Sequence, residues 1–329
     1  MTEPFRIGLI GLGAIGYRVA KAFAANPETR VAVVCDTNAE LAAKVADELG
    51  ADRWVTDYRE MLVGDQVDLV YVGVPPRWHK QIAFDILDAG KHIFCEKPLA
   101  LTLDEAEAMT ARAREAGVIH AVNLPMHGSL GIATLREQVA AGYLGQFRQG
   151  ELELIFPQWP RAWQQNPWIG KREQGGPIRE VMPHMLHALM QTFGPVTRVR
   201  ADMAYPVDDT EACEIAVSGA LELAGGGMIT VSCLCGVDRK ETVQFTAYGT
   251  EGTLGLVEWD RPVGAKGPGA LEPLPVPQEG RIATLQLLVR ALKGEQVELP
   301  GFEAGLAIQQ VLDAWERAAE IGGWVAVKR

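Results

Sequence analysis

The feature that most restricts the fold is a regular alternation of two kinds of segment over residues 1–123. Short apolar runs rich in β-branched residues predict strands at Ile7–Ile10, Val31–Cys35, Leu69–Val74, His92–Cys95 and Val118–Val122. Segments with apolar residues at helical spacing predict helices at Ala14–Ala25, Ala39–Leu49, Trp78–Ala89 and Leu103–Ala116. Strands that alternate with helices form a parallel sheet with helices on both faces. We therefore expect an α/β domain with a doubly wound parallel sheet over residues 1–123.

Residues 124–329 follow a different pattern and predict a second, α+β domain. After a helix at Leu130–Ala141, strands are expected at Phe147–Phe156, Val196–Tyr205, Cys213–Leu223, Gly227–Leu234, Thr242–Tyr248 and Thr253–Glu258. Short gaps between consecutive strands favour a large, mostly antiparallel sheet. One face of such a sheet usually packs on its own helices, and we expect the other to form a subunit interface. Pro262–Gly280, rich in proline and glycine, predicts a long loop before helices at Ile282–Leu292 and Phe302–Ile321.

Composition excludes several classes of protein. The chain has 31 Lys and Arg residues against 42 Asp and Glu residues, a net charge of −11, which repels nucleic acids and anionic membrane surfaces. No uncharged apolar run reaches the roughly 20 residues of a membrane-spanning helix. The N-terminus has no basic region leading into an apolar segment, as a signal peptide would. We expect a cytoplasmic protein that binds neither nucleic acid nor membrane.

The five cysteines indicate a reducing compartment, because their number is odd and their spacing irregular. Cys233 and Cys235 share one face of an expected strand. Simple filling of the sheet explains them better than a metal site, since no other ligand accompanies them. No metal is expected.

A glycine-rich turn follows the first expected strand. Gly11, Gly13 and Gly16 form the pattern G-x-G-x-x-G, with Ala14 and Ile15 at the start of the next helix. The first glycine permits a tight turn, the second lets the backbone approach a pyrophosphate, and the third lets helix and strand pack closely. The N-terminus of the helix stabilises the phosphate charge. This turn predicts dinucleotide binding.

Asp36 indicates which dinucleotide binds. It ends the second expected strand, 20 residues after Gly16. Its carboxylate can accept hydrogen bonds from ribose hydroxyls and would repel the 2′-phosphate of NADP. Thr37 and Asn38 follow, so no Arg or Lys stands there to bind that phosphate. We expect NAD over NADP; the alternative, that Asp36 only caps the following helix, remains open.

Two further strand ends carry residues suited to chemistry. In an open parallel sheet, ligands bind beyond the carboxyl ends of the strands, where Val74–His79 and Glu96–Pro98 are expected to lie. A lysine at this edge, Lys97, could exchange a proton with an alcohol or ketone as hydride moves to or from a nicotinamide. The alternative for Lys97 is a surface lysine paired with Glu96.

These motifs together resemble the glucose–fructose oxidoreductase/inositol dehydrogenase/rhizopine catabolism (Gfo/Idh/MocA) family of NAD(P)-dependent oxidoreductases. The resemblance covers nearly the whole chain. It rests on the glycine turn, Val-Pro-x-x-x-His at 74–79, Ala-Gly-Lys-His-x-x-x-Glu-Lys-Pro at 89–98 and a segment with glycines and histidines at 175–187. The motif at 89–98 is far more specific than the glycine turn. The resemblance implies a Rossmann domain followed by an α+β domain with a mostly antiparallel sheet.

The resemblance also implies roles for three residues. Lys97 matches a lysine that is catalytic and binds substrate in the family. His184 matches the family's catalytic histidine, and Glu180 matches the acidic position four residues earlier. Residues four apart on a helix share a face, so Glu180 could orient His184, although Pro183 between them is expected to bend the helix. A buried structural histidine is the alternative for His184.

The second half departs from the family pattern at several positions. Glu180 replaces the usual Asp, Pro183 replaces an ordinary residue, and His187 stands where the family often has Asp. The family's Asn-Arg-Arg after the last Rossmann strand is reduced to a segment from Asn123 to His127. These changes fall where substrate is expected to bind. For His127 and His187, a structural role is an equal alternative to substrate binding.

An aromatic segment precedes the histidines. Trp159, Trp163 and Trp168 lie within ten residues, with amides and Arg161 between them. Indole faces beside hydrogen-bond donors suit the C–H face and hydroxyls of a sugar or cyclitol ring. We expect at least one of these tryptophans to contact substrate; closing a domain interface is the alternative for each.

The sequence therefore predicts an NAD-dependent oxidoreductase that moves hydride between the nicotinamide and a secondary alcohol, ketone or hemiacetal of a sugar-like or cyclitol-like substrate. The expected cofactor contacts are Gly11, Gly13, Ala14, Ile15, Gly16, Asp36, Thr37, Val74, Pro75, Trp78, His79, Glu96, Lys97 and Asn123. The expected substrate contacts are Lys97, Trp159, Trp163, Trp168, His184 and His187. Two alternatives remain: a glycoside hydrolase that oxidises its substrate transiently with NAD, and a sensor without catalysis. The resemblance implies a homodimer or homotetramer.

Overall fold

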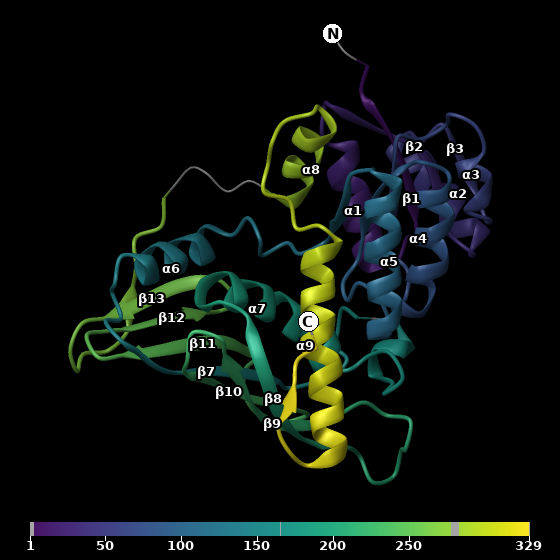
Figure 1. Ribbon diagram of the computed structural model, residues 1–329. Helices are drawn as coiled ribbons and strands as arrows, with labels where there is room; N and C mark the ends of the chain where they lie inside the picture. The colour runs from purple at the N-terminus through teal and green to yellow at the C-terminus, as the bar shows by residue number, and fades with distance from the viewer. Residues whose placement is uncertain (1–2, 165, 278–282, 329) are drawn as a thin grey trace. The chain divides into compact units, whose positions relative to one another are not determined.

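The computed structural model describes residues 3–164, 166–277 and 283–328 (Figure 1). The chain divides into two compact units. The first comprises Met1–Leu124 with Thr284–Gln309, and the second comprises Pro125–Ala283 with Gln310–Arg329. This division differs from the expected one, in which residues 124–329 form a single continuous domain.

Residues 284–309 belong to the first unit because hydrogen bonds and an apolar contact hold them there. Thr284 Oγ1 donates to the carbonyl of Leu124 at 3.2 Å, and the Val122 N–H donates to the carbonyl of Pro300 at 2.8 Å. Leu288, in helix α8 (Thr284–Leu292), is buried in the apolar core of the first unit. A local sequence pattern predicts the helix but not the unit on which it packs.

Six parallel strands form the sheet of the first unit, in the order β3-β2-β1-β4-β5-β6. They are β1 (Phe5–Ile10), β2 (Thr29–Cys35), β3 (Arg53–Val55), β4 (Leu69–Val72), β5 (His92–Cys95) and β6 (His120–Val122). The helices between them are α1 (Ala14–Ala24), α2 (Ala39–Leu49), α3 (Arg59–Leu62), α4 (His79–Asp88) and α5 (Leu103–Ala116), with a 3-10 turn η1 (Pro76–Trp78). The doubly wound fold is confirmed. The sequence analysis missed β3 because two of its three residues are exposed, so no apolar run marks it.

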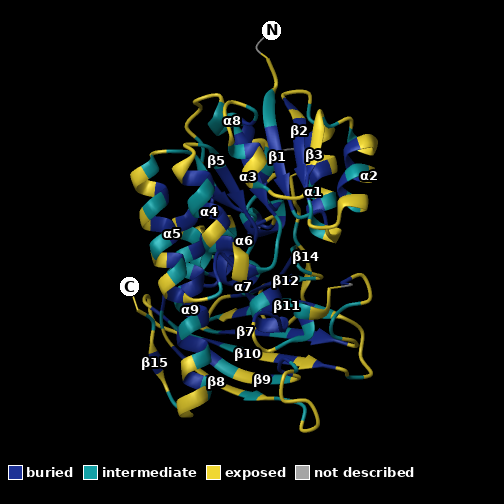
Figure 2. Ribbon diagram, turned by 90° about the vertical axis from the view of Figure 1, so that its right-hand side faces the viewer, coloured by how far each residue is buried: buried dark blue, intermediate teal, exposed yellow. Residues whose placement is uncertain are grey.

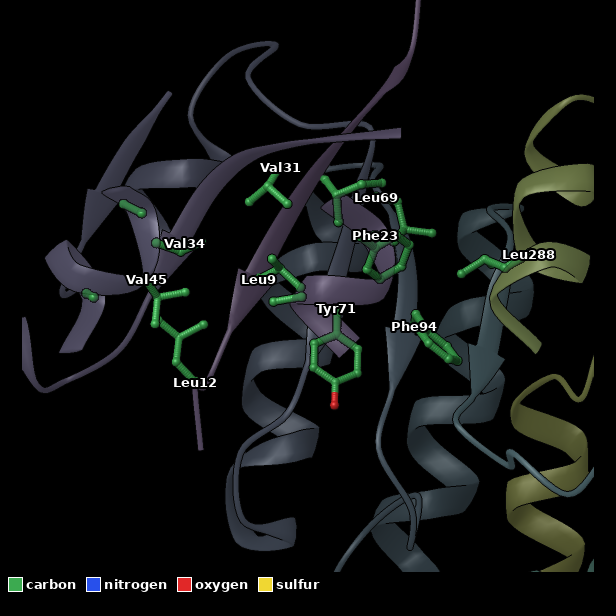
Figure 3. Packing of buried hydrophobic residues seen from close by; sticks show 14 of the residues in the cluster. Leu9, Leu12, Phe23, Val31, Val34, Val45, Leu69, Tyr71, Phe94 and Leu288 are labelled. Atoms are coloured by element: carbon green, nitrogen blue, oxygen red, sulfur yellow. The ribbon is translucent and has the colours of Figure 1, made fainter. Parts of the chain in front are cut away.

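Apolar side chains join one face of this sheet to α1, α2 and α8 (Figure 3). Leu9, Tyr71 and Phe94 come from the neighbouring strands β1, β4 and β5 and are buried. The ring of Phe94 lies 6.4 Å from that of Phe23 in α1, edge to face, and 5.6 Å from that of Tyr71. On the other face, α4 packs on β4 and β5. Figure 2 shows these strands as buried, while the outward faces of α2 and α5 are exposed.

Nine strands form the sheet of the second unit, in the order β14-β13-β12-β11-β7-β10-β9-β8-β15. They are β7 (Phe147–Phe156), β8 (Val196–Ala204), β9 (Ala216–Leu223), β10 (Met228–Cys235), β11 (Thr242–Gly249), β12 (Thr253–Val257), β13 (Arg261–Ala265), β14 (Glu272–Pro273) and β15 (Val325–Ala326). Neighbours pair antiparallel except β7 and β10, which are parallel. The mostly antiparallel sheet is confirmed. The parallel pair arises because β7 enters the middle of the sheet instead of joining β8 by a hairpin.

Helices cover one face of this sheet. They are α6 (Leu130–Ala140), α7 (Pro177–Phe193) and the later turns of α9 (Phe302–Ile321). Phe193 of α7 packs on Phe245 of β11 at 5.5 Å, and Gly219 of β9 leaves room for the buried ring of Trp315. The opposite face carries exposed residues such as Ser232. That this face forms a subunit interface stays a prediction.

Two details of the second unit differ from expectation. Part of the expected loop Pro262–Gly280 is regular, since β13 and β14 extend the sheet there. Residues 278–280 of that loop, and Ile282 of the expected helix Ile282–Leu292, lie outside the described residues. The expected strand Cys213–Leu223 begins only at Ala216, and the Cys213 N–H donates instead to the carbonyl of Gly170 at 2.9 Å.

The core of the first unit gives a stability prediction. Phe94 is 2% exposed, and truncation of such a side chain leaves a cavity. Phe94→Ala is expected to lower the free energy of unfolding by about 3–5 kcal/mol, measured by urea denaturation. Trp54→Ala is the control, since Trp54 on β3 is 44% exposed and its loss should change stability by about 0.5 kcal/mol or less. Equal effects of the two variants would contradict the assigned core.

Candidate active site

The glycine turn of the first unit has the geometry of a phosphate-binding loop. Gly11 has a φ of 86°, and a Cβ there would lie 2.4 Å from the carbonyl oxygen of Gly73. A Cβ on Gly16 would lie 2.0 Å from the carbonyl oxygen of Gly11. Gly13 is the exposed N-cap residue of α1, and no side-chain hydrogen bond closes that helix end. The first N–H groups of α1 are therefore directed at solvent beside the turn, where a pyrophosphate fits.

Asp36 lies beside this turn and does not cap the next helix. Its Oδ2 accepts the Leu12 N–H at 2.9 Å, and its Oδ1 accepts the Asn38 N–H at 2.9 Å. The side chain of Asn38 caps α2 by accepting the Leu41 N–H. Each carboxylate oxygen of Asp36 has further lone pairs, so the group retains acceptor capacity for ribose hydroxyls. Thr37, next to it, is exposed.

The Glu-Lys-Pro segment is fixed by a buried carboxylate. Glu96 Oε1 accepts hydrogen bonds from the Tyr71 hydroxyl, at 2.8 Å, and from Asn123 Nδ2. Glu96 Oε2 accepts the N–H of Lys97 at 3.3 Å. Burial raises the pKa of Glu96, while Lys97 and these hydrogen bonds oppose the rise. The backbone of half-buried Lys97 is therefore held at the carboxyl end of β5.

His79 contacts backbone carbonyl groups next to the same segment. Its Nε2 lies 2.8 Å from the carbonyl oxygen of Val74, and its Nδ1 lies 3.1 Å from those of Pro98 and Leu99. The side chain is fully buried, and burial lowers its pKa. With both ring nitrogens directed at backbone carbonyls, His79 is placed to hold two loops together. A direct contact of His79 with the cofactor stays a prediction; Trp78 beside it is exposed.

Helix α7 carries Glu180, His184 and His187 of the second unit. Glu180 is buried and its Oε2 accepts a hydrogen bond from Gln164 Nε2 at 3.5 Å. His184, one turn later, is half-buried, and its ring lies 6.3 Å from that of Trp259, edge to face. Pro183 lies inside α7, which continues through it to Phe193.

Arg161 lies in the centre of an aromatic cluster. Its guanidinium carbon is 4.7 Å from the ring centre of Trp163, 5.6 Å from that of Trp159 and 5.7 Å from that of Trp259. Gln164 Oε1 accepts hydrogen bonds from both the backbone N–H and Nε of Arg161, each at 3.1 Å. Burial lowers the pKa of Arg161, which Glu241 and Glu180 oppose. Cation–π contacts of this kind hold indole rings in place.

The cluster contains two of the three expected tryptophans and one that the sequence analysis missed. Trp168 lies in the 3-10 turn η2 (Pro167–Gly170), and no cation–π contact between it and Arg161 is found among the described residues. Trp259 joins the cluster because Glu258 and Trp259 have φ angles of 49° and 79°. Non-glycine residues rarely adopt such angles, and no sequence motif marks them here.

His127 and His187 lie against each other in the second unit. His127 Nδ1 is 3.0 Å from His187 Nε2 and 3.4 Å from Gln191 Nε2, and Arg136 donates to Gln191 Oε1 at 3.3 Å. Since the amide nitrogen of Gln191 can only donate, His127 Nδ1 accepts and His187 Nε2 donates. Burial, then His127 and Arg136, lower the pKa of His187 to about 4. His187 is therefore neutral at pH 7 and has a partner within the protein.

Three observations concern metals, cysteines and membranes. Within the described ranges, no group of three or more His, Cys, Asp or Glu residues is placed to hold a metal ion. All five cysteines are free and buried, and Cys233 and Cys235 lie on the helix-covered face of β10. No helix of the described residues is both long and apolar enough to cross a membrane.

The chain matches two sequence families. Residues 5–124 match "Oxidoreductase family, NAD-binding Rossmann fold", and residues 132–255 match "GFO/IDH/MocA C-terminal domain". The chain belongs to the Gfo/Idh/MocA family. It is an NAD-binding oxidoreductase, and the predictions of family, fold and cofactor are confirmed.

Relatives within the Gfo/Idh/MocA family have named activities. D-glucoside 3-dehydrogenase of Escherichia coli (strain K12) is 25% identical over 98% of this chain and 97% of its own. The scyllo-inositol 2-dehydrogenase (NAD(+)) of Bacillus subtilis (strain 168) is 32% identical over 44% of this chain and 43% of its own. The structure of levoglucosan dehydrogenase in complex with NADH and levoglucosan has a TM-score of 0.87 at 22% identity, covering 99% of this chain and 100% of that one. At that identity the structure supports the fold alone.

The position of Asp36 gives a test of the cofactor site. If its carboxylate binds the adenosine ribose, Asp36→Asn removes charge-assisted hydrogen bonds and is expected to raise the Kd of NADH about tenfold. The Kd is measured by NADH fluorescence. The control is Asp47→Asn, an exposed carboxylate on α2, which should leave the Kd unchanged. A Kd for Asp36→Asn equal to that of the wild type would place the ribose elsewhere.

Proposed function

We propose that this oxidoreductase is an NAD-dependent dehydrogenase or reductase of a neutral sugar or cyclitol, with Lys97 as the acid and base for the substrate hydroxyl. The observation that carries the proposal is the fixed backbone of Lys97. Buried Glu96 holds it at the carboxyl end of β5, at the same sheet edge as the glycine turn. Ligands of open parallel sheets bind at that edge.

Oxidation of a CH–OH group requires the transfer of a hydride from the carbon and of a proton from the hydroxyl. The glycine turn and Asp36 would hold NAD⁺, which would supply the hydride acceptor. Lys97 Nζ takes the hydroxyl proton, so the group becomes a ketone, or a lactone where the substrate is a hemiacetal; in the reverse direction Lys97 returns the proton. His184 hydrogen-bonds the same or a neighbouring hydroxyl and orients the ring. General acid–base catalysis of this kind contributes about 10²–10⁴-fold.

Glu180 acts on His184 through the shared face of α7. Residues at i and i+4 lie one turn apart on a helix, and Gln164 fixes the carboxylate of Glu180 by a hydrogen bond. A carboxylate beside a histidine stabilises the imidazolium form. We infer that Glu180 is a positioning residue for His184.

The aromatic cluster supports a neutral ring as substrate. Trp163 is 43% exposed, which leaves indole surface for the C–H face of a sugar. The charge of Arg161 is opposed by Glu241, at 3.9 Å, and by Glu180, so it offers little net attraction to an acidic sugar. The names of two relatives, a glucoside dehydrogenase and an inositol dehydrogenase, agree with this substrate class.

The role of Lys97 is tested by substitution. Lys97→Met keeps the length of the side chain but cannot exchange a proton, and we expect kcat to fall by about 10²–10⁴-fold with the Kd of NADH unchanged. The assay follows NADH absorbance with NAD⁺ and a panel of cyclitols, aldoses and glycosides. Lys44→Met, an exposed lysine on α2, is the control. Near-normal turnover by Lys97→Met would exclude this mechanism.

The glycosides in the panel separate dehydrogenation from hydrolysis. Net NADH formation without free aglycone supports the proposed reaction. Release of free sugar without net NADH would show transient oxidation and overall hydrolysis. NADH binding without either product from any compound would favour a sensor.

The aromatic cluster gives a second prediction. Trp163→Ala is expected to raise KM for the sugar about threefold to tenfold, with little change in kcat, because ring stacking contributes about 0.5–1.5 kcal/mol. Trp324→Ala is a matched control: Trp324 is 37% exposed and stacks on Arg198 at 4.8 Å, as Trp163 stacks on Arg161. Equal KM values in both variants would show that Trp163 does not contact the substrate.

A further inference from the structure

Glu214 is a buried carboxylate at the start of α7, outside every motif that the sequence analysis used. It is 5% exposed. Its Oε1 accepts the N–H of Ile178, the second residue of α7, at 3.0 Å. The N-terminus of a helix stabilises a negative charge placed against it. Helix α7 carries Glu180, His184 and His187, so this contact lies at the base of the helix with the candidate catalytic residues.

The backbone of Gly176, the N-cap residue of α7, lies directly against this carboxylate. It has a φ of 100°, and a Cβ there would lie 2.4 Å from Glu214 Oε2 and 2.7 Å from Oε1. Any side chain at residue 176 would therefore displace the carboxylate. The second glycine of the segment 175–176 is explained by the close approach of Glu214, an interaction within the protein.

Gly175 connects the same junction to the tryptophan loop, by which we mean residues 157–164 and 166–170. A Cβ on Gly175 would lie 2.4 Å from the carbonyl oxygen of Trp168 and 2.3 Å from that of Ile169. The Gly176 N–H donates to the Ile169 carbonyl at 2.9 Å, and the Cys213 N–H donates to the Gly170 carbonyl at 2.9 Å. The residue before Glu214, the end of the tryptophan loop and the start of α7 are thus joined by backbone hydrogen bonds.

Charged and titratable groups surround Glu214 on several elements. Arg179 of α7 favours its charged form and Glu316 of α9 opposes it, and these two residues form an ion pair at 2.7 Å. Tyr205, Cys213 and Cys233 interact electrostatically with Glu214, and the guanidinium carbon of Arg172 lies 3.5 Å from the ring centre of Tyr205. Burial raises the pKa of Glu214 to about 7, with the Ile178 hydrogen bond and Arg179 lowering it.

We propose that ionised Glu214 is a positioning residue, which holds the first turn of α7 against the tryptophan loop and so sets the place of His184 in the substrate site. The kinetic part rests on the proposed function, because it gives His184 a substrate contact. Above about pH 7 the carboxylate is charged and binds the helix N-terminus strongly. Below that pH it is protonated and the hydrogen bond from Ile178 weakens.

The test variant is Glu214→Gln, which keeps an acceptor for Ile178 but removes the charge. The ratio of wild-type to variant kcat is expected to be near one below about pH 6 and to reach about tenfold above about pH 8, because small displacements of a catalytic group slow the reaction. The Kd of NADH, which binds the other unit, should not change. The control is Glu211→Gln, an exposed carboxylate paired with Lys171, for which the ratio should be near one throughout.

The melting temperature distinguishes a positioning role of Glu214 from a general structural role. Since the pKa of Glu214 is raised in the folded state, its contribution to stability is present below its unfolded pKa and is lost as pH rises through about 7. At pH 8, Glu214→Gln should therefore melt at the same temperature as the wild type or higher, although it is less active. A variant that is less stable and equally impaired at every pH would overturn the proposal.

Hydrogen exchange tests the same contact without substrate. Local opening of the first turn of α7 breaks the hydrogen bond from Ile178 while Glu214 stays buried, so the stronger bond to the charged carboxylate opposes it even though that charge does not favour global folding. At pH 8, peptides covering residues 177–184 are therefore expected to exchange about tenfold faster in Glu214→Gln than in the wild type, while peptides from α9 stay unchanged. If no compound in the panel is turned over, the proposed function fails, but this measurement still decides the role of Glu214. Exchange at 177–184 that is equal in wild type and variant would overturn the proposal.

Discussion

The buried carboxylate of Glu96 holds together the edge of the sheet on which the proposed chemistry depends. It accepts hydrogen bonds from Tyr71 in β4, from Asn123 just after β6, and from the N–H of Lys97 just after β5. Three neighbouring strands therefore end at one acceptor group. A buried charge without partners is costly, whereas one with several donors is stable and fixes the geometry of its donors. Lys97 takes its position from this arrangement.

In the second unit, a cation and a carboxylate hold separate segments together, as Glu96 does in the first. Arg161 contacts three indole rings, and Glu214 accepts a hydrogen bond from the start of α7 beside the loop that bears two of them, Trp159 and Trp163. Glycines permit the close approaches in both units: Gly16 against Gly11, and Gly176 against Glu214. In each case the absent Cβ gives space to another group of the protein.

Much of the first unit could be predicted from sequence, because strand, helix and glycine turn are local patterns. Asp36 at the end of β2 and the segment at 89–98 also follow from position along the chain. The motif that contains His79 is visible in the sequence, but two of its three carbonyl neighbours belong to Pro98 and Leu99, about 20 residues away. Trp259 and Glu214 could not be found, since their roles depend on an unusual backbone conformation and on a contact 36 residues distant.

The return of residues 284–309 to the first unit has a consequence for how the protein forms in the cell. Leu288 completes a core whose other buried members lie in residues 7–121, so a ribosome makes strands β7 to β14 of the second sheet before the first core can close. The nascent nucleotide-binding unit must wait, with apolar surface uncovered, for more than 150 residues of synthesis. Cutting the gene after residue 124 would not yield an independent cofactor-binding module, and a C-terminus shortened to before residue 284 would damage both units.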